Sequence, residues 1–366
     1  MELIYIMLYP LKFKPIFKEK IWGGDVLKRR YNMKLPSSKI GESWNIASHK
    51  NGMSVVSNGP LKGESLEDII KKYGRKLLGK TDDGKTIDEF PLLIKLLDAR
   101  DVLSVQVHPD DVYAKEYESG ELGKTEMWYI IDADPGSFIV YGVEPNITRD
   151  GFRKAIEAGD VESCLRRLDI EPGDVIYMPA GMVHAIGAGI LLCEIQQNSD
   201  TTYRVYDWDR IGDDGMPREL HIDKALDVID FEGLYTRDKL NGLTIYEGDS
   251  SKTYYIATNH FAVEKLRIQG TLADSTDCHN FHALTAIEGS GCIVYEKGHV
   301  EFSGGDSILI PAVLGNYKIE GNTTLIKAYM PNINEDIISP LLKKGFCRHE
   351  LLKITGIKEE TLENIN

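Results

Sequence analysis

The stretch Glu171–Arg210 reads EPGDVIYMPAGMVHAIGAGILLCEIQQNSDTTYRVYDWDR and decides how this chain folds around its most informative residue. It begins with a Gly-Asp turn, continues into the apolar run Val175–Met178, and turns again at a Pro-x-Gly sequence before His184. Turn residues on both sides of a short apolar run are typical of a β-strand between two tight turns. This frame predicts that His184 re-enters the mouth of a β-barrel and points inward as a metal ligand, whereas a lone histidine is more often an ordinary core or surface residue.

Short β-branched and aromatic runs separated by Gly, Asp, Asn and Pro recur along the chain. Such runs at close spacing are typical of strands in a sandwich or barrel. The expected strands are Leu103–Val107, Phe138–Tyr141, Val175–Met178, Ile190–Ile195, Tyr254–Thr258, Ala262–Ile268, Cys292–Tyr295, Ser307–Ile310 and Leu325–Tyr329. We therefore expect a mainly β fold.

Helical patterns interrupt the strands in only a few places. Ser65–Leu78 has apolar residues at helical spacing behind a serine that can serve as N-cap. Thr148–Leu168 predicts two short helices divided near Gly159, with Thr148 and Asp160 as candidate caps. Ile222–Ile229 predicts one more short helix.

The two ends of the chain differ from its middle. Leu3–Tyr9 is apolar, but it lacks a basic flank and is too short to span a bilayer, so we expect an edge or pairing strand. The tail Ile338–Asn366 is charge-rich with helical periodicity, which predicts one or two helices packed on a barrel.

An internal repeat indicates two barrels of one design. GDVIYMPA at Gly173–Ala180 recurs as GDSILIPA at Gly305–Ala312, and upstream FIVY at 138–141 is echoed by CIVY at 292–295. We expect residues 1–235 to form a metal-binding barrel with helical insertions, 236–332 a second and degenerate barrel, and 333–366 a helical tail.

The two copies of the repeat differ in their chemistry. Five residues after the proline of the repeat, the first copy has His184 and the second has Asn316. The second barrel is therefore expected to lack this ligand. His279 and His282 could suggest a metal there, but no further ligands accompany them.

Composition restricts the class of protein. The chain has 366 residues, 42% hydrophobic and 27% charged, as in a globular protein with a substantial core. Its formal net charge of −14 disfavours nucleic acid and anionic lipid as partners and means that an anionic substrate needs a locally basic pocket. Five cysteines without a C-x-x-C pair favour reduced thiols in the cytoplasm over a disulfide framework.

Two further segments supply candidate ligands. In the strand Leu103–Val107 and the residue after it, Gln106 and His108 are two apart and share a face, opposite to the valines. Such a pair inside a barrel needs bonding partners, and a hydrogen-bonded polar pair accounts equally well for this segment alone. Glu126 in GKTEMWYI precedes an aromatic strand and supplies a carboxylate, although alone it would more often be a surface acid. Two imidazoles, a carboxylate and an amide oxygen suit one Zn²⁺ per chain, with Mn²⁺, Co²⁺ and Fe²⁺ also compatible.

These motifs together resemble those of the type I mannose-6-phosphate isomerases (phosphomannose isomerases) of the cupin superfamily, in their short bacterial form. The resemblance covers roughly residues 10–330 and is carried by IWGG (21–24), IGESWNIA (40–47), SVQVHPDD (104–111), GKTEMWYI (123–130), PAGMVHAIGAG (179–189) and QQNSDTTYRVYDWDR (196–210). It implies two cupin (jelly-roll) barrels. It also implies that Gln106, His108, Glu126 and His184 are zinc ligands and that Arg204 is a catalytic arginine.

The same resemblance implies which residues surround the substrate. Lys95, Ser104 and Lys124 fall at positions that in relatives lie around the sugar and its phosphate, and Glu194 matches an active-site carboxylate. Interconverting mannose 6-phosphate and fructose 6-phosphate moves one proton between C1 and C2 through a cis-enediol, which needs a base and an electrophile for the enediolate oxygen. Either Glu194 or Lys124 could be that base.

Several of these side chains could instead have a purely structural role. Arg204 could form a salt bridge with Asp207 or Asp209, and Lys95 could pair with Asp98 or Asp101. Trp22, Trp44 and Trp128 are expected to pack in the core, although they could wall the sugar.

Three other functions compete with the isomerase. His108, Glu126 and His184 could form the facial triad of an Fe(II) oxygenase. A glucose-6-phosphate isomerase or a non-catalytic sugar-binding protein with two barrels is a further alternative. The expected partner is a small sugar phosphate, and the protein could be a monomer or a homodimer.

Overall fold

The computed structural model describes residues 7–80, 87–212, 215–233 and 238–363. Contacts divide the chain into two units, and each unit combines segments that are distant in sequence. Unit 1 comprises Met1–Ile16, Asn45–Pro91 and Leu240–Asn366, and unit 2 comprises Phe17–Trp44 and Leu92–Lys239. The expected ligands and substrate residues all belong to unit 2.

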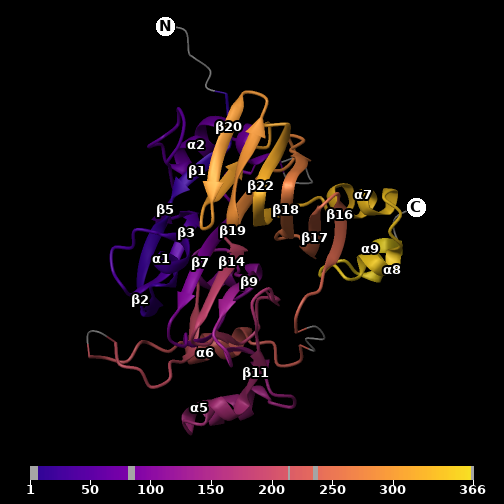
Figure 1. Cartoon of the computed structure of the whole chain (residues 1–366). Helices are drawn as coiled ribbons and strands as arrows, with labels where there is room; N and C mark the ends of the chain where they lie inside the picture. Colours follow the sequence, from indigo (N-terminus) through magenta and orange to yellow (C-terminus); the bar gives the residue numbers. More distant parts are fainter. Residues whose placement is uncertain (1–6, 81–86, 213–214, 234–237, 364–366) are drawn as a thin grey trace. The chain divides into compact units, whose positions relative to one another are not determined.

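Unit 2 contains two antiparallel sheets in its described part (Figure 1). The first has the order β11 (Leu165–Asp169), β10 (Phe138–Val143), β13 (His184–Ile186), β8 (Val105–Val107) and β15 (Tyr203–Tyr206). The second has the order β12 (Val175–Met178), β9 (Glu126–Ala133), β14 (Ile190–Gln197), β7 (Leu92–Ala99), β2 (Ile16–Gly24) and β3 (Ile40–Ile46). The helices of this unit are α1 (Val26–Tyr31), α4 (Asp111–Tyr117), α5 (Arg149–Glu157), the 3₁₀ turn η1 (Val161–Cys164) and α6 (Ile222–Val228).

The packing of unit 2 fixes which side chains point into the interior between its two sheets. Val105 and Val107 of β8 belong to an apolar cluster with Phe152 of α5 and Leu226 of α6. A second cluster, which includes Trp128 and Ile186, fills the space on the other side of this sheet. Because side chains alternate along a strand, Gln106 must face away from the helices and toward the interior.

Unit 1 contains one extended antiparallel sheet in its described part. Its order is β16 (Leu243–Glu247), β17 (Ser250–Ala257), β18 (Ala262–Ser275), β22 (Asn316–Tyr329), β19 (His282–Tyr295), β21 (Ser307–Ile310), β1 (Leu11–Lys14) and β6 (Val55–Val56), and β20 (Gly298–Ser303) pairs with β19. The smaller elements of this unit are β4 (Ser48–His49), β5 (Gly52–Met53), α2 (Leu66–Tyr73) and α3 (Arg75–Leu78). Strand β1 joins both ends of the chain in one sheet, since Leu11 pairs with Leu309. This pairing explains why unit 1 is discontinuous.

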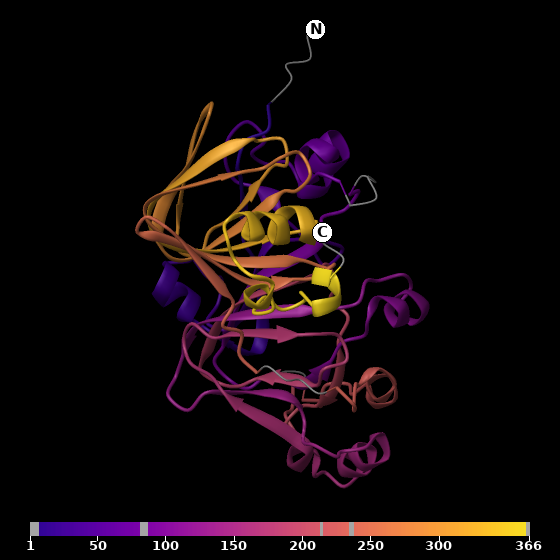
Figure 2. The ribbon, with the colours of Figure 1, turned by 90° about the vertical axis from the view of Figure 1, so that its right-hand side faces the viewer.

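The C-terminal tail is helical, as expected. It contains the π-helical turn η2 (Ile333–Ile338), α7 (Ser339–Lys343), α8 (Arg348–Leu351) and α9 (Glu359–Glu363). Figure 2 shows these yellow helices beside the orange strands of unit 1. Ile338, Leu351 and Ile354 pack in one cluster with Leu243 and Ile245 of β16, so the tail covers an apolar face of the sheet.

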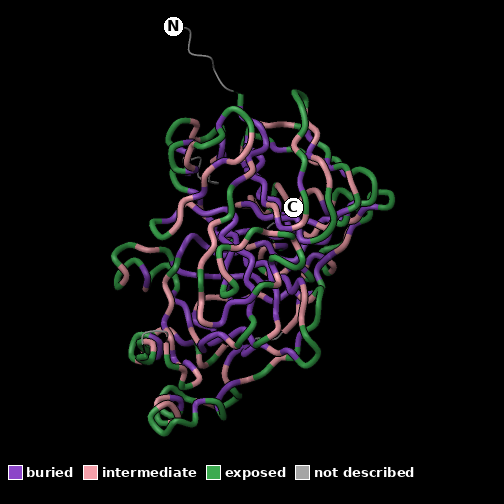
Figure 3. The backbone as a smooth tube through the Cα atoms, turned by 60° about the vertical axis from the view of Figure 1, so that its left-hand side comes forward, coloured by how far each residue is buried: buried purple, intermediate pink, exposed green. Residues whose placement is uncertain are grey.

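The mainly β fold with a helical tail is confirmed, and Val175–Met178 and Ser307–Ile310 are strands with the expected bounds. All residues of β7 and β14 are buried, and Figure 3 shows exposed stretches at the outer bends of the chain. The caps Ser65 and Thr148 accept the expected backbone hydrogen bonds at α2 and α5.

Two expectations about local structure need correction. The second helix expected within Thr148–Leu168 is wrong: only the 3₁₀ turn η1 forms there, and the chain then enters β11, which pairs with β10. In the expected strand Leu3–Tyr9, residues 3–6 lie outside the described residues, residues 7–10 are not in a strand, and β1 begins at Leu11. No helix among the described residues is long and apolar enough to cross a membrane.

Candidate active site

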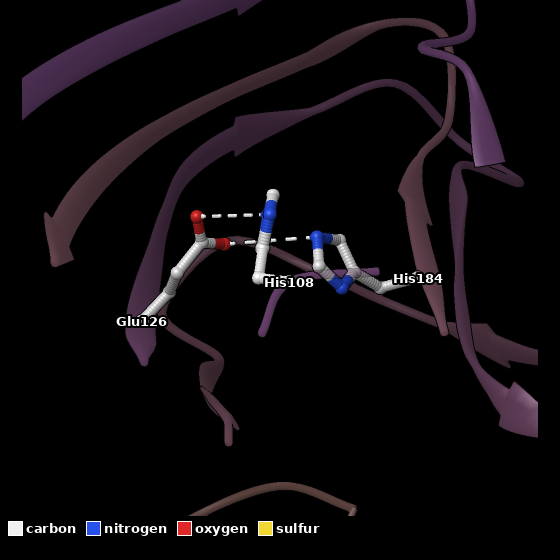
Figure 4. Close-up of side chains that lie close together, drawn as sticks. All are labelled: His108, Glu126 and His184. Atoms are coloured by element: carbon white, nitrogen blue, oxygen red, sulfur yellow. Dashed lines mark ion pairs between the residues drawn. The ribbon is translucent and has the colours of Figure 1, made fainter. Parts of the chain in front are cut away.

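Three of the four expected ligands converge at the interior of unit 2. His108 follows β8, Glu126 begins β9 and His184 begins β13, and one donor atom from each lies within 4.8 Å of the others (Figure 4). His108 Nε2 is 3.4 Å from Glu126 Oε1, and His184 Nε2 is 3.8 Å from Glu126 Oε2. All three side chains are at most 2% exposed.

The turn before β13 places His184. Gly181 has φ +86°, a left-handed conformation that favours glycine, and its N–H donates to the carbonyl of His108 at 2.9 Å. This bond connects the turn of one histidine to the backbone of the other. The Pro-x-Gly sequence therefore brings two donors together.

Backbone carbonyls orient both imidazoles. His108 Nδ1 is 2.8 Å from the carbonyl of Thr201, and His184 Nδ1 is 2.9 Å from that of Met182. A proton on each Nδ1 leaves both Nε2 atoms as lone-pair donors toward Glu126. The indole N–H of Trp128 donates to Glu126 Oε2 at 3.1 Å and fixes the carboxylate.

Protonation states also suit metal binding. Burial, assisted by the neighbouring Lys124 ammonium, lowers the pKa of His108 to about 3, and burial also lowers the pKa of His184. Burial opposes the charge of Glu126, but Lys124 and the two imidazoles outweigh it and hold its pKa well below the usual range. Two neutral imidazoles and a carboxylate are the forms that bind a cation.

The donor set fits a divalent cation. His184 Nε2 is buried without a hydrogen-bond partner among the described residues, which is costly unless another group binds there. Gln106 is the cross-strand partner of His184 and lines the adjoining cavity. Lys124 Nζ contacts the Glu126 carboxylate and lies 3.1 Å from His108 Nε2, so a cationic group already occupies the neighbourhood of these donors.

A cavity of about 320 Å³ adjoins this cluster through Gln106 and Lys124. Its lining contains five cationic and three anionic side chains: Lys20, Lys95, Lys124, Arg204 and Arg218, and Glu42, Glu194 and Asp200. Ser104, Thr202 and Trp22 also line it. The cavity thus has an excess of positive charge within a chain of net charge −14.

Glu194 and Lys95 form a buried ion pair on the wall of this cavity. Lys95 Nζ is 3.1 Å from Glu194 Oε2, and Trp128 donates to Glu194 Oε1 at 3.0 Å. The partner of Lys95 is therefore Glu194, and the expected alternatives Asp98 and Asp101 do not pair with it. Burial, with the nearby charge of Glu126, raises the pKa of Glu194 despite Lys95.

Arg204 lies in line with the candidate metal donors. On three adjacent strands, His184 pairs with Gln106 and Gln106 pairs with Arg204. Arg204 Nη1 donates to the carbonyl of Glu219 at 2.7 Å, and its Nε is buried without a hydrogen-bond partner among the described residues. The alternative salt bridge to Asp207 is not formed, because Arg210 and Arg218 bind that carboxylate.

Sequence reasoning missed several cavity residues, of which Glu42 had a recognisable signal. Glu42 and Trp44 repeat the Glu-x-Trp spacing of Glu126 and Trp128, and in both pairs the indole N–H donates to the glutamate, at 2.6 Å and 3.1 Å. Burial opposes the Glu42 charge, but Lys95 and Lys20 lower its pKa to about 2. Asp200 and Thr202 lie inside the quoted run 196–210 but were not singled out, and Lys20 and Arg218 reach the cavity only through the tertiary fold.

Comparisons with known proteins agree with this geometry. Residues 10–135 match the family model "Phosphomannose isomerase type I, catalytic domain" and residues 250–330 match "Mannose-6-phosphate isomerase, cupin domain". The chain is 43% identical to the mannose-6-phosphate isomerase ManA of Bacillus subtilis over 321 residues, 88% of this chain and 99% of that protein. It is also 43% identical to the probable mannose-6-phosphate isomerase GmuF of the same organism over 316 residues, 86% and 97% of the two chains.

A solved structure gives the same result. The crystal structure of a Bacillus subtilis mannose 6-phosphate isomerase superposes with a TM-score of 0.81 at 40% identity, covering 88% of this chain and 99% of that one. The chain therefore belongs to the type I mannose-6-phosphate isomerase family.

Proposed function

We propose that this protein interconverts mannose 6-phosphate and fructose 6-phosphate by proton transfer through a cis-enediol, with one Zn²⁺ held by Gln106, His108, Glu126 and His184. The observation that carries the proposal is the buried cluster of His108, Glu126 and His184, whose imidazoles are neutral and oriented, beside a cavity with excess positive charge. Mn²⁺, Co²⁺ or Fe²⁺ could occupy the same donors. When bound, such an ion would stabilise negative charge that develops on a substrate oxygen.

Glu194 is the better candidate for the base. It lines the cavity, and its pKa is raised toward neutral pH. Lys95 and Trp128 each bind one of its two carboxylate oxygens. A carboxylate with these properties can take a proton from C1 or C2 and return it to the neighbouring carbon. Lys124 is less suited, because its ammonium contacts Glu126 and the imidazole of His108.

The remaining cavity residues would hold the substrate. We assign Lys95, Ser104 and Lys124 to contacts with the sugar phosphate, and Arg204 to the oxygens of the enediolate. Arg204 retains donors that no described residue uses, as this role requires. The excess of positive charge suits a dianionic substrate in a strongly negative chain.

A coupled assay of fructose 6-phosphate formed from mannose 6-phosphate, with and without chelator, tests this function. Turnover should disappear with chelator, return with Zn²⁺ and proceed without oxygen. Full turnover of a metal-free preparation would contradict the proposal. A requirement for Fe(II) and oxygen would support an oxygenase, preference for glucose 6-phosphate a different isomerase, and binding without turnover a sugar-binding protein.

The Arg204→Ala variant separates the roles of arginine and metal. We expect a large loss of turnover with the zinc content unchanged. A parallel loss of zinc would show that Arg204 is structural.

Three broader assignments remain proposals. A cytoplasmic location is supported by the five cysteines, all of which are free thiols. A monomer or a homodimer is compatible with this fold. The domains 1–235, 236–332 and 333–366 stay a prediction, and contacts group the chain differently, into the two discontinuous units described above.

A further inference from the structure

Three arginines gather at one carboxylate beside the cavity. Asp207 is only 6% exposed, and it accepts hydrogen bonds from both Arg210 and Arg218. Arg204 lies near enough for the charges of Arg218 and Arg210 to lower its pKa, after the larger effect of burial. Asp101, 3.8 Å from Arg210 Nη1, and Glu219 near Arg204 add negative charge, whereas among the described contacts Arg218 has Asp207 as its carboxylate partner and shares it with Arg210.

The lysines of the cavity are in a different situation. Each has a glutamate partner: Lys20 Nζ is 2.8 Å from Glu42, Lys95 Nζ is 3.1 Å from Glu194, and Lys124 Nζ contacts Glu126. The positive charge that remains for an anionic ligand is thus concentrated on the arginines.

Arg218 and Arg210 bind Asp207 in different ways. Arg210 uses all three guanidinium nitrogens on protein oxygens, those of Asp207 and the carbonyl of Val102. Arg218 uses Nε, at 2.7 Å, and Nη2 on the two carboxylate oxygens, and its Nη1 has no hydrogen-bond partner within the described residues. Arg218 lines the cavity and Arg210 does not. Asp207 therefore holds one edge of the Arg218 guanidinium and leaves the other available.

We propose that Arg218, positioned by Asp207, binds the phosphate group of the substrate and makes the site specific for phosphorylated sugars. A guanidinium with one fixed edge is a preorganised donor for phosphate oxygens. Gln106 and Arg218 line the same cavity, so one ligand can place its carbonyl end near Gln106 and its anionic end near Arg218. This inference rests on the proposed function and assigns the phosphate end of the same cavity.

Kinetics of Arg218→Gln and its matched control Arg210→Gln test the inference. Arg218→Gln should raise KM for mannose 6-phosphate roughly 10- to 100-fold, the range for a lost hydrogen bond to a charged group, with a smaller change in kcat. Competitive inhibition by inorganic phosphate should weaken by a similar factor, while inhibition by unphosphorylated mannose and the zinc content should not change. Arg210→Gln should leave phosphate inhibition within about threefold of wild type, because that side chain does not line the cavity.

Several outcomes would overturn the inference. Unchanged phosphate inhibition in Arg218→Gln would exclude the contact. An equal loss in Arg210→Gln would show that phosphate responds to the summed charge of the arginines and makes no specific contact with Arg218. Arg218→Lys, which keeps the charge but not the fork, should give an intermediate loss and replaces Arg218→Gln if the latter does not fold. Thermal stabilisation by inorganic phosphate measures the same contact without turnover, so failure of the isomerase assay and failure of this subsite are distinguishable.

Discussion

At matching strand positions inside the two β units, one unit has a glutamate where the other has a lysine. In unit 2, Glu194 lies between Lys95 and Trp128 on neighbouring strands, and the ion pair is 3.1 Å long. In unit 1, Lys327 lies between Glu264 and Leu284 in the same arrangement, and its ion pair is 3.4 Å long. The repeat has kept a buried pair and reversed its polarity.

The positions of the candidate metal donors diverge more strongly. Glu126 pairs with Met178, and the matching residue His282 pairs with Ile310. His282 Nδ1 lies 2.7 Å from the hydroxyl of Tyr317, whereas His184 Nδ1 lies 2.9 Å from the carbonyl of Met182.

An ammonium supplies the positive charge of the second interior. Lys327 Nζ is 2.9 Å from Asp274 Oδ2, and Lys252 Nζ lies 3.7 Å from the same oxygen. The comparison teaches that two neutral imidazoles gather at the carboxylate of Glu126 in unit 2, whereas two ammonium groups gather at Asp274 in unit 1.

Removing the central histidine of each unit should separate the two interiors most sharply. His184→Ala should abolish metal retention and turnover together, because a buried donor is lost from the cluster. His282→Gln in unit 1 should keep both within a few fold. Metal analysis and the coupled assay measure both effects. Comparable losses in the two variants would contradict the assignment of the metal to unit 2.

The matching ion-pair residues give the next largest contrast. Glu194→Gln should reduce kcat by about 10²- to 10⁴-fold, the usual contribution of a general base, with zinc content unchanged. Because the base must be ionised and its pKa is raised, wild-type kcat/KM should fall as the pH drops through a value above the ordinary carboxylate range. Glu264→Gln should leave kcat nearly unchanged, and equal losses in the two variants would show that both act through folding.

The buried ion pair of unit 1 should instead affect the stability of the fold. Lys327→Met leaves Glu264 and Asp274 without their closest cation and should destabilise the fold by about 3–5 kcal/mol. Combining it with Glu264→Met should recover part of this loss, since removing both charges of a buried pair costs less than removing one. Denaturant unfolding measures both variants, and an unchanged midpoint in Lys327→Met would show that the buried pair contributes nothing.

A smaller effect should appear as a pH dependence of stability. Burial, with the charge of Lys327, lowers the pKa of His282 to about 3, so the unfolded chain binds a proton near its ordinary pKa and the folded chain does not. Stability from this group is complete above about pH 6.5 and is lost as the pH falls toward 3, on the order of 1 kcal/mol between about pH 7 and 5.5. His282→Gln should flatten this dependence in melting experiments, and an unaltered slope would contradict it.

Local sequence signals predicted much of the fold. Turn residues around β12 and β21 fixed both strands, because Gly and Pro restrict the backbone whatever the tertiary context. The helix expected after Asp160 failed because pairing with β10 overrode helical propensity. The distant strand β1 could not be placed in unit 1 from local patterns, since its partner lies at the other end of the chain.

Local sequence motifs also predicted part of the candidate site. His108, Glu126 and His184 were found because their motifs are specific, and the structure brings them together. Asn316 was matched to His184 by its distance from the proline of the repeat. In the structure Asn316 is exposed, and the next residue, Tyr317, is buried and contacts His282. Arg218 could not be predicted, because its role depends on which edge of the guanidinium Asp207 holds.

The pairing of Leu11 with Leu309 has a consequence for synthesis on the ribosome. At roughly 5–20 residues per second, β1 leaves the exit tunnel tens of seconds before its partner strand is translated. Unit 2 needs nothing beyond Lys239, so it can be finished while unit 1 still lacks most of its sheet. β1 can pair early with β6, but its opposite edge must wait for β21, so the nascent chain carries one open strand edge during most of translation.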